Sequence, residues 1–309
     1  MKFLKPKFWN SKKFSIISYA LIPLSFFWKL IFFLNKISTR EKKVEAFVIC
    51  VGNIYIGGTG KTPLSLKLFS LLKKKNKNCA FIRKKYLEYQ DEIELLKLKG
   101  PTYEDRKRIN AINNAIKDNL DIVIMDDGFQ DFSIKKNISI VCFHEKQWLG
   151  NGFTIPSGPL RENLSGLKRA NYAFINGKKN DYNENILLEK NRFLKIFYYS
   201  YKPTNIKLFE NKKAICFAGI GNPNNFFDLI KKNNIDIIEE ISFPDHYDFS
   251  EKDLKNLEQK AENSDAILLT TEKDYLRLGD SYKKKINYLS IEVEIENEDN
   301  FIEELIKKI

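Results

Sequence analysis

Residues 44–75 read VEAFVICVGNIYIGGTGKTPLSLKLFSLLKKK, an apolar run followed by a glycine-rich segment and a leucine-rich one. The apolar run at 44–51 predicts a short buried strand. Leucines then recur at helical spacing, at Leu64, Leu68, Leu71 and Leu72. The glycine-rich segment between strand and helix therefore lies where phosphate-binding loops are found.

The residue types of this segment suit the phosphates of a nucleotide. Its glycines allow the tight turns that aim backbone amides at phosphate oxygens. Lys61 can reach the β- and γ-phosphates, and Thr62 can place its hydroxyl on Mg²⁺. The residues expected to bind the nucleotide are Tyr55, Ile56, Gly57, Gly58, Thr59, Gly60, Lys61 and Thr62. The strict pattern G-x-x-x-x-G-K-[ST] is not met, because Tyr55 takes the place of the first glycine; a plain strand–turn–helix remains the alternative.

An acidic pair supports the nucleotide hypothesis. Residues 121–127 read DIVIMDD, which predicts a buried strand that delivers Asp126 and Asp127 to the carboxyl edge of a sheet. With Thr62, one of these carboxylates is expected to hold Mg²⁺. An ordinary Asp-Asp-Gly turn is the alternative when such a string stands alone.

Alternating strands and helices predict an α/β fold with a mostly parallel sheet, like that of P-loop NTPases. Further strands are expected at 79–82, 138–143 and 172–175, with a helix pattern at 104–119. After residue 195 the same alternation predicts a second, smaller α/β lobe. The expected domains are a membrane-associating helix at 1–40, a nucleotide-binding core at 41–195 and a lobe at 196–309 that closes over the site.

The front end is a hydrophobic helix with one polar edge. Residues 14–34 read FSIISYALIPLSFFWKLIFFL, and Lys29 is their single charge. At about 100° per residue, the polar positions fall within an arc of about 80°. Those positions are Ser15, Ser18, Ser25, Lys29 and Lys36. The stripe favours a helix that lies in a membrane interface or docks by its polar edge, and Pro23 predicts a kink or break. A bilayer span and a buried core helix are the alternatives.

Composition narrows the class of protein. The 309 residues carry 52 basic and 40 acidic side chains, a net charge of +12, with 43% hydrophobic residues. That excludes a wholly disordered chain and a disulfide-stapled scaffold, and it suits an anionic partner. The four cysteines lie far apart beside apolar runs, which predicts free thiols in a reducing compartment. Only two histidines occur, which argues against a histidine zinc site.

Six strings, taken together, resemble the tetraacyldisaccharide 4'-kinase family, the lipid A 4'-kinases. They are VGNIYIGGTGKTP (51–63), DDGFQ (126–130), GNGFTIPSGPLRE (150–162), FAGIGNPNNFF (217–227), FPDHYDF (243–249) and TTEKDYLRL (270–278). They occur in the order found in the family. The apolar amino-terminal segment is also similar to the family's usual start.

The resemblance implies a membrane-associated kinase that uses ATP and Mg²⁺. It implies transfer of the γ-phosphate to the 4'-hydroxyl of an acylated glucosamine disaccharide 1-phosphate lipid, which gives lipid IVA in lipid A biosynthesis. The implied location is the cytoplasmic face of the inner membrane, where the protein is peripheral or monotopic and meets an anionic surface. No nucleic-acid partner is expected.

The resemblance implies that both Asp126 and Asp127 serve Mg²⁺ and the phosphates. It also implies catalytic roles for Lys61, Asp91 and His246. The family's Asp-Glu pair matches Asp91-Glu92, with Asp91 as the base, and His246 in FPDH would orient or assist it. On their own, Asp91 reads as a helix N-cap and His246 as a turn residue. The chain departs from the family after the second strand, where a shortened segment, FIRKKYLEYQDE, lacks the usual Arg-Gly-Tyr-Gly. Asp131 also stands where the family often has His.

Two other classes of function stay open on the residues alone. A membrane-peripheral P-loop ATPase could act as a nucleotide switch, although no Asn-Lys-x-Asp string supports guanine specificity. A basic nucleic-acid-binding protein would need a known module, and none is recognisable.

Overall fold

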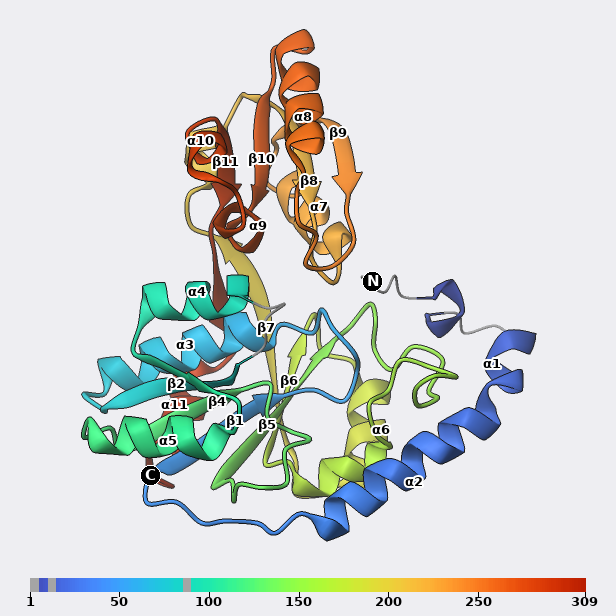
Figure 1. Ribbon diagram of the computed structural model, residues 1–309, viewed down its shortest axis with the longest axis vertical. Coiled ribbons are helices and arrows are strands. Elements are labelled where there is room, and N and C mark those ends of the chain that lie inside the picture. The colour runs from blue at the N-terminus through green and yellow to red at the C-terminus, as the bar shows by residue number, and fades with distance from the viewer. Residues whose placement is uncertain (1–5, 11–14, 86–89) are drawn as a thin grey trace. The chain divides into compact units, whose positions relative to one another are not determined.

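The computed structural model describes residues 6–10, 15–85 and 90–309. Within them the chain forms two compact units. The larger unit holds residues 99–200 and 294–309 together with the described residues up to 85. The smaller unit holds residues 90–98 and 201–293 (Figure 1).

The larger unit is built on a mostly parallel sheet, as predicted. In the described residues this sheet has eight strands in the order β12-β7-β6-β5-β1-β4-β2-β3. The strands are β1 (Phe47–Gly52), β2 (Cys79–Lys84), β3 (Thr102–Asp105), β4 (Ile122–Asp126), β5 (Ile138–His144), β6 (Tyr172–Asn176), β7 (Lys195–Pro203) and β12 (Ile291–Ile295). From β7 to β3 every neighbouring pair is parallel. The loops that follow the strands therefore gather at one carboxyl edge.

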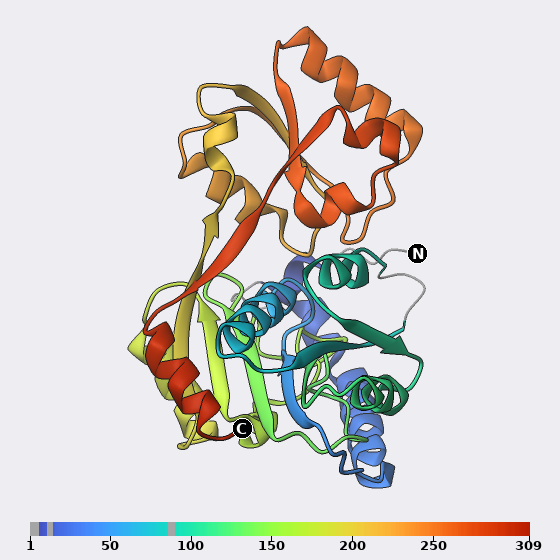
Figure 2. The same cartoon turned by 90° about the vertical axis from the view of Figure 1, so that its left-hand side faces the viewer.

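Helices cover both faces of this sheet. They are α3 (Lys61–Lys74), α5 (Arg108–Lys117), α6 (Asp181–Lys190) and α11 (Glu298–Ile306), with a 3₁₀ turn at η2 (Leu164–Arg169). Neighbouring strand residues point to opposite faces. In β2, Phe81 packs on Phe69 of α3, while Ala80 joins a buried cluster with Ala111 of α5. In β6, Phe174 contacts α11 on the same face as α3 (Figure 2).

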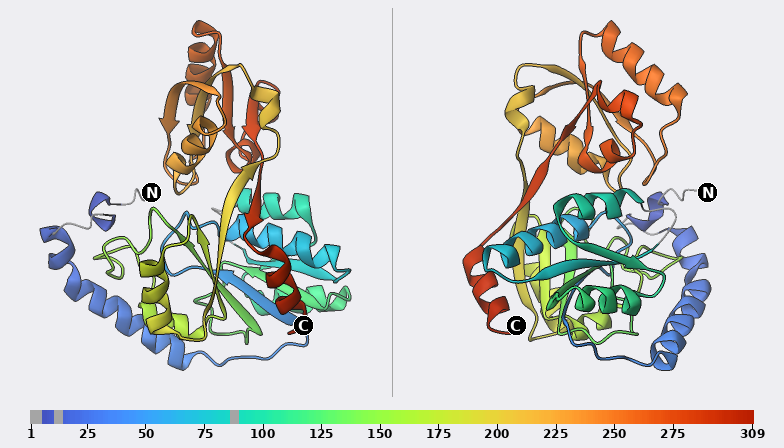
Figure 3. Two further views of the ribbon diagram at one scale, coloured as in Figure 1. Left: turned by 180° about the vertical axis from the view of Figure 1, so that it is seen from behind. Right: turned by 60° about the vertical axis from the view of Figure 1, so that its left-hand side comes forward.

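The amino-terminal segment packs into the larger unit. It contains η1 (Lys7–Trp9), α1 (Ile16–Ala20) and α2 (Ile22–Ser38). The predicted break occurs at Leu21, and Pro23 stands in the first turn of α2. Figure 3 shows α2 from two sides, running along the edge of the unit. Among the described helices, none is both long enough and apolar enough to cross a bilayer.

The smaller unit is a second α/β assembly, as predicted. In the described residues its sheet has four strands in the order β11-β10-β8-β9, and all three neighbouring pairs are parallel. Its strands are β8 (Lys213–Ala218), β9 (Asp236–Ser242), β10 (Ile267–Thr271) and β11 (Ile286–Leu289). Its helices are α4 (Gln90–Lys99), η3 (Ile206–Phe209), α7 (Pro223–Lys231), α8 (Glu251–Asn263), α9 (Glu272–Leu276) and α10 (Asp280–Lys283).

The predicted domain boundaries at 40 and 195 need three corrections. The described residues before 40 belong to the larger unit, because Ser18 and Ser25 are buried against it. Residues 294–309 return to the larger unit, because Phe301 packs among the aromatic rings of its sheet. Residues 90–98 belong to the smaller unit, where Asp91 pairs with His246.

The four cysteines are free and buried, as the sequence indicates. Burial raises the pKa of the Cys50 and Cys142 thiols. Thiols of this kind are structural rather than reactive.

Candidate active site

The predicted phosphate loop follows β1 and ends in the first turn of α3. Gly57, Gly58 and Gly60 have positive φ angles of 71°, 61° and 84°, a backbone conformation that glycine adopts without strain. The side-chain amide of Asn53 donates to Thr59 Oγ1 at 2.8 Å, and Tyr199 donates to the Thr59 carbonyl at 3.1 Å. Hydrogen bonds from the residue after β1 and from β7 therefore hold the loop in place.

Asp126 lies at the end of β4, beside the start of α3. Its carboxylate accepts hydrogen bonds from Thr62 Oγ1 and Ser65 Oγ, each at 3.0 Å. Arg83, at the end of β2, forms an ion pair with the same carboxylate. Asp126 is fully buried, so these three donors satisfy a charge that would be costly if it were unpaired. The structure brings Thr62 and Asp126 together, as predicted.

Asp127 lies next to the loop lysine and is held by an arginine that the sequence did not single out. Arg161 donates to both Asp127 carboxylate oxygens, at 2.8 and 3.3 Å. Lys61 Nζ lies 3.9 Å from Asp127 Oδ1. Burial opposes ionisation of Asp127, but the charges of Lys61, Arg161 and Arg83 outweigh it and lower the pKa of this carboxyl. Asp127 is therefore an anion flanked by two cations that could turn toward phosphate oxygens.

Tyr55 points into the protein. The side chain is fully buried, and its hydroxyl donates to Asn10 Oδ1 at 2.6 Å. Burial raises the pKa of Tyr55 to about 12, so it remains a neutral donor. A large residue fits at this position of the loop because the ring occupies the core of the unit.

A second cluster of charged side chains lies in the smaller unit, where loops follow the carboxyl ends of its parallel strands. Asp91 stands in the first turn of α4, and both of its carboxylate oxygens lie 3.2 Å from His246 Nδ1. Lys273 Nζ lies 3.7 Å from Asp91 Oδ2, and Arg277 Nε lies 3.4 Å from the same oxygen. The sequence hypothesis that Asp91 and His246 act as a pair thus has geometric support within one unit.

The surroundings of Asp91 favour its ionised form. Burial raises its pKa, but the hydrogen bond with His246 and the charges of Lys273 and Arg277 together outweigh burial. The resulting pKa is about 2. Asp91 is therefore a carboxylate at neutral pH and can accept a proton or a hydrogen bond.

Lys273 also orients the histidine. Its ammonium lies 3.3 Å from His246 Nε2 and 2.8 Å from Glu92 Oε1. Because a lysine ammonium can only donate, this contact favours the imidazole tautomer with its proton on Nδ1, facing Asp91. The backbone N–H of His246 donates to the Gly219 carbonyl at 2.9 Å, which ties the loop to the end of β8.

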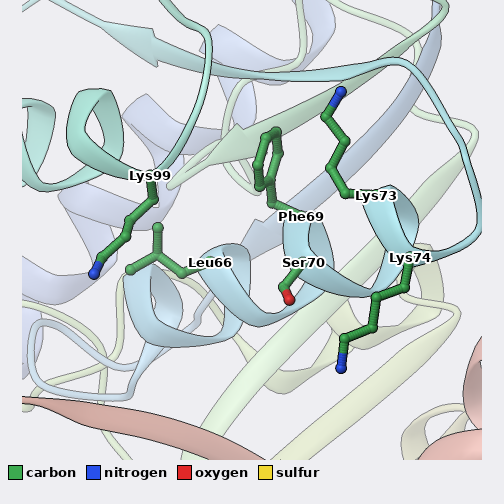
Figure 4. A pocket seen from close by; sticks show the side chains of 6 residues that line it. All are labelled: Leu66, Phe69, Ser70, Lys73, Lys74 and Lys99. Atoms are coloured by element: carbon green, nitrogen blue, oxygen red, sulfur yellow. The ribbon is translucent and has the colours of Figure 1, made fainter.

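A pocket elsewhere on the larger unit contains none of the predicted site residues. It is lined by Leu66, Phe69, Ser70, Lys73, Lys74 and Lys99. Figure 4 shows that its three lysine side chains point in different directions. Because the ammonium groups do not converge, the pocket does not offer the geometry of an anion site.

Comparison with known proteins decides the family. A family model described as tetraacyldisaccharide-1-P 4'-kinase matches residues 17–309. The chain belongs to this family. A tetraacyldisaccharide 4'-kinase of Pelagibacter ubique (strain HTCC1062) is 41% identical over 316 residues, covering 99% of this chain and 98% of that protein. One of Rickettsia bellii (strain OSU 85-389) is 33% identical over 327 residues, covering 100% and 99%.

A solved structure shares the fold. LpxK from Aquifex aeolicus, in complex with ATP, superposes with a TM-score of 0.72 at 24% sequence identity, covering 95% of this chain and 99% of that one. The predicted α/β fold is confirmed. The predicted family and its enzyme class, a kinase that phosphorylates an alcohol group, are confirmed by the family match and the relatives. They favour the kinase over the nucleotide switch.

The chain departs from the family pattern at Asp131 and in the shortened segment after β2. Asp131 accepts hydrogen bonds from Arg108 Nη1 at 2.8 Å and from Ser133 Oγ at 2.6 Å. Arg108 in turn donates to the Asp127 carbonyl at 2.6 Å, so Asp131 supports the loop that carries Asp127. Four of the twelve residues of the shortened segment, 86–89, lie outside the described residues.

Sequence reasoning missed three cations of the site: Arg161, Lys273 and Arg277. All three lie within strings that carry the family resemblance, at 150–162 and 270–278. Their presence in those strings was a usable signal. The strings do not show which carboxylate each of the three cations contacts.

Proposed function

We propose that the protein transfers the γ-phosphate of ATP to the 4'-hydroxyl of tetraacyldisaccharide 1-phosphate, giving lipid IVA. The observation that carries the proposal is the phosphate loop, with Lys61 beside Asp127 and with the Thr62 hydroxyl 3.0 Å from Asp126, in a chain of the 4'-kinase family. This is the arrangement that phosphoryl transfer from a nucleotide requires.

The nucleotide is assigned to residues 55–62. Backbone amides around Gly57, Gly58 and Gly60 surround the β-phosphate, and the amino end of α3 adds favourable partial charge. Lys61 leaves its loose contact with Asp127 and binds the β- and γ-phosphates. Arg161 is the second cation that contacts Asp127. It can stabilise the negative charge that develops on the phosphates during transfer.

The residues fit a Mg²⁺ ion. Thr62, Asp126 and Asp127 offer a hydroxyl and carboxylates, the hard oxygen ligands that Mg²⁺ prefers. In the described residues, no group of three or more His, Cys, Asp or Glu side chains is arranged for a metal. Water and phosphate oxygens would have to complete the coordination of a bound Mg²⁺. When bound, the ion neutralises charge on the phosphates.

The acceptor is assigned to the smaller unit. A sugar hydroxyl is a weak nucleophile, and we assign Asp91 as the carboxylate that receives its proton. With a pKa of about 2, Asp91 is a weak base. In a loose transition state the attacking hydroxyl loses its proton late, so the reaction needs little base strength. Orientation of Asp91 by His246 and Lys273 therefore matters more than its basicity.

The membrane partner is an anionic inner surface on the cytoplasmic side, met by the outward face of α1 and α2. This outward face is formed by Ile16, Ile17, Leu24, Phe26, Phe27, Leu30, Ile31, Phe33, Leu34 and Ile37, which are all exposed. Lys29, Lys36 and Arg40 are exposed on or after the same helix. Apolar side chains edged by cations favour an interfacial helix on anionic lipid, which leaves the acyl chains of the substrate in the membrane.

The function is tested by following γ-labelled phosphate from ATP, with Mg²⁺, into tetraacyldisaccharide 1-phosphate in detergent micelles. Wild type should label the lipid, and Lys61→Ala should not, because it removes the cation on the transferred phosphate. Lys77→Ala, in the segment between α3 and β2, is the control and should label normally. No labelled lipid from a wild-type protein that binds ATP would refute the proposed acceptor.

The membrane assignment has its own test. Replacing Phe26, Phe27 and Ile31 together by Ser should shift the protein from vesicles that contain anionic lipid to the soluble fraction. Removal of residues 1–36 should do the same. Retention of the triple variant on the vesicles would contradict the assigned face.

A further inference from the structure

The loop at 150–162 is joined to the phosphate loop by backbone hydrogen bonds. The Arg161 N–H donates to the Ile54 carbonyl at 2.7 Å, and the Ile56 N–H donates to the Pro159 carbonyl at 2.9 Å. Tyr55 and Leu160 form an antiparallel bridge between them. The backbone of Arg161 and the start of the phosphate loop are therefore fixed to one another.

The other side of the same loop is held by the amino-terminal segment. Trp9 Nε1 donates to the Pro156 carbonyl at 2.9 Å. Ser25 of α2 donates to the Thr154 carbonyl at 2.8 Å and accepts from the Ser157 N–H at 3.1 Å. These polar contacts explain why serines of an otherwise apolar segment are buried.

Trp28 of α2 contacts Arg161 in this loop. Its indole N–H donates to the Arg161 carbonyl at 2.9 Å. The guanidinium of the same arginine holds Asp127 beside Lys61. One residue thus links α2 to the phosphate-binding side chains, and both contacts lie within the larger unit.

Helix α2 also packs beside the loop that carries Asp127. Phe32 meets the Phe132 ring edge-on, with ring centroids 5.5 Å apart, and Lys36 Nζ lies 6.0 Å from the same ring. Phe132 follows the DDGFQ string by two residues. The inward side of α2 therefore contacts both loops that form the Asp127–Arg161 pair.

We propose that Trp28 is a positioning residue for ATP binding, which acts by holding Arg161 against Asp127 and the phosphate loop. The inference rests on the proposed function, because it requires that residues 55–62 bind ATP. It gives α2 a second role beside membrane contact: its outward face meets lipid, while Trp28, which is 38% exposed, sets the position of a phosphate-binding arginine. Removal of residues 1–36 should therefore weaken ATP binding even where no membrane is present.

The test compares two tryptophan variants of the full chain in detergent micelles, with the dissociation constant of ATP measured by calorimetry in the presence of Mg²⁺. Trp28→Phe keeps an aromatic ring but removes the N–H that holds Arg161. Trp148→Phe is the matched control, because the Trp148 indole nitrogen has no hydrogen-bond partner among the described residues. Trp28→Phe should weaken ATP binding roughly threefold to fivefold, the effect of losing one modest hydrogen bond. Trp148→Phe should bind ATP as wild type does.

A second pair of variants separates positioning from a general loss of structure. In an Arg161→Gln background, Trp28→Phe should cause no further loss of ATP affinity, because its effect passes through the arginine. Ser25→Ala loosens the same loop and should weaken ATP binding in the same direction as Trp28→Phe. Thermal melts show whether either variant has lost its fold.

Three results would overturn the inference. One is wild-type ATP affinity in Trp28→Phe; another is an undiminished effect of Trp28→Phe in the Arg161→Gln background. The third is an equal loss in Trp148→Phe. Because the readout is ATP binding, the inference can fail while lipid phosphorylation is intact. If the wild-type protein did not bind ATP, the proposed function would fail together with the inference.

Discussion

Replacement of Asp91 by Asn tests the assigned base most sharply. The change keeps the size of the side chain and a hydrogen-bonding oxygen, but it removes the charge and the capacity to accept a proton. Asp91 is nearly fully buried between His246, Lys273 and Arg277, so the local packing should survive. Any loss of turnover should then report on chemistry at this carboxylate.

The size of the effect follows from the pKa of the carboxyl. General bases contribute about 10²- to 10⁴-fold, most when their pKa lies near the working pH. Asp91 has a pKa of about 2, far below neutrality, which places it at the lower end of that range. We expect kcat to fall about 100-fold, which corresponds to about 2.7 kcal/mol. ATP affinity should stay within about twofold of wild type, because the phosphate loop lies in the other unit.

The assay is steady-state transfer to the lipid acceptor, with ATP binding measured in parallel. Asp236→Asn is the control, since Asp236 is an exposed aspartate at the start of β9 in the same unit. The pH dependence of wild-type kcat should show no limb from Asp91 between pH 5 and 8. Normal turnover by Asp91→Asn would refute the assignment of the base, and an equal loss of ATP affinity would refute its placement on the acceptor side.

Two predictions concern stability. Phe301→Ala should destabilise the protein by about 3–5 kcal/mol, seen as a lower Tm, because the fully buried ring packs on Tyr172, Phe174 and Phe197; an unchanged Tm would contradict the return of residues 294–309 to the larger unit. The folded pKa of Asp91 lies below its ordinary value of 3.8, so its stabilisation, about 2 kcal/mol, is present above pH 4 and lost as the pH falls toward 2. The stability gap between wild type and Asp91→Asn should therefore shrink over that interval in thermal melts; a constant gap would contradict the lowered pKa.

Local patterns predicted most of the elements. The run at 44–51, the glycines and the spaced leucines describe β1, the phosphate loop and α3, because each depends on residues close in sequence. The exception is the helix pattern at 104–119. Residues 104 and 105 belong to β3, which pairs with β2, and α5 begins only at Arg108. Pairing with a neighbouring strand decided a conformation that periodicity left ambiguous.

The boundaries between units could not be predicted, because they depend on contacts between distant segments. No pattern within residues 294–309 predicts that Phe301 packs on β6 and β7. Likewise, α4 joins the smaller unit through Asp91, whose partners come from residues more than a hundred positions later. Long-range pairing of this kind leaves no trace in local spacing.

The chemistry of the site was predictable in part. Lys61, Thr62, Asp126 and Asp127 followed from a strand–loop–helix pattern and a strand that ends in carboxylates. Asp91 and His246 came from the family resemblance alone, since each reads as an ordinary capping or turn residue. The roles of Arg161 and Trp28 could not be predicted, because each depends on a partner that is distant in sequence and that only the fold brings near.

The position of the new phosphate on the lipid shows whether transfer is to the 4'-hydroxyl. Wild-type protein should be incubated with ATP, Mg²⁺ and tetraacyldisaccharide 1-phosphate, and the lipid product analysed by ³¹P NMR with proton correlation. We expect a second phosphate monoester, correlated with the proton at the 4' carbon, and no such product from Lys61→Ala. A pyrophosphate at the 1 position, a monoester on another hydroxyl, or unchanged lipid would contradict this expectation.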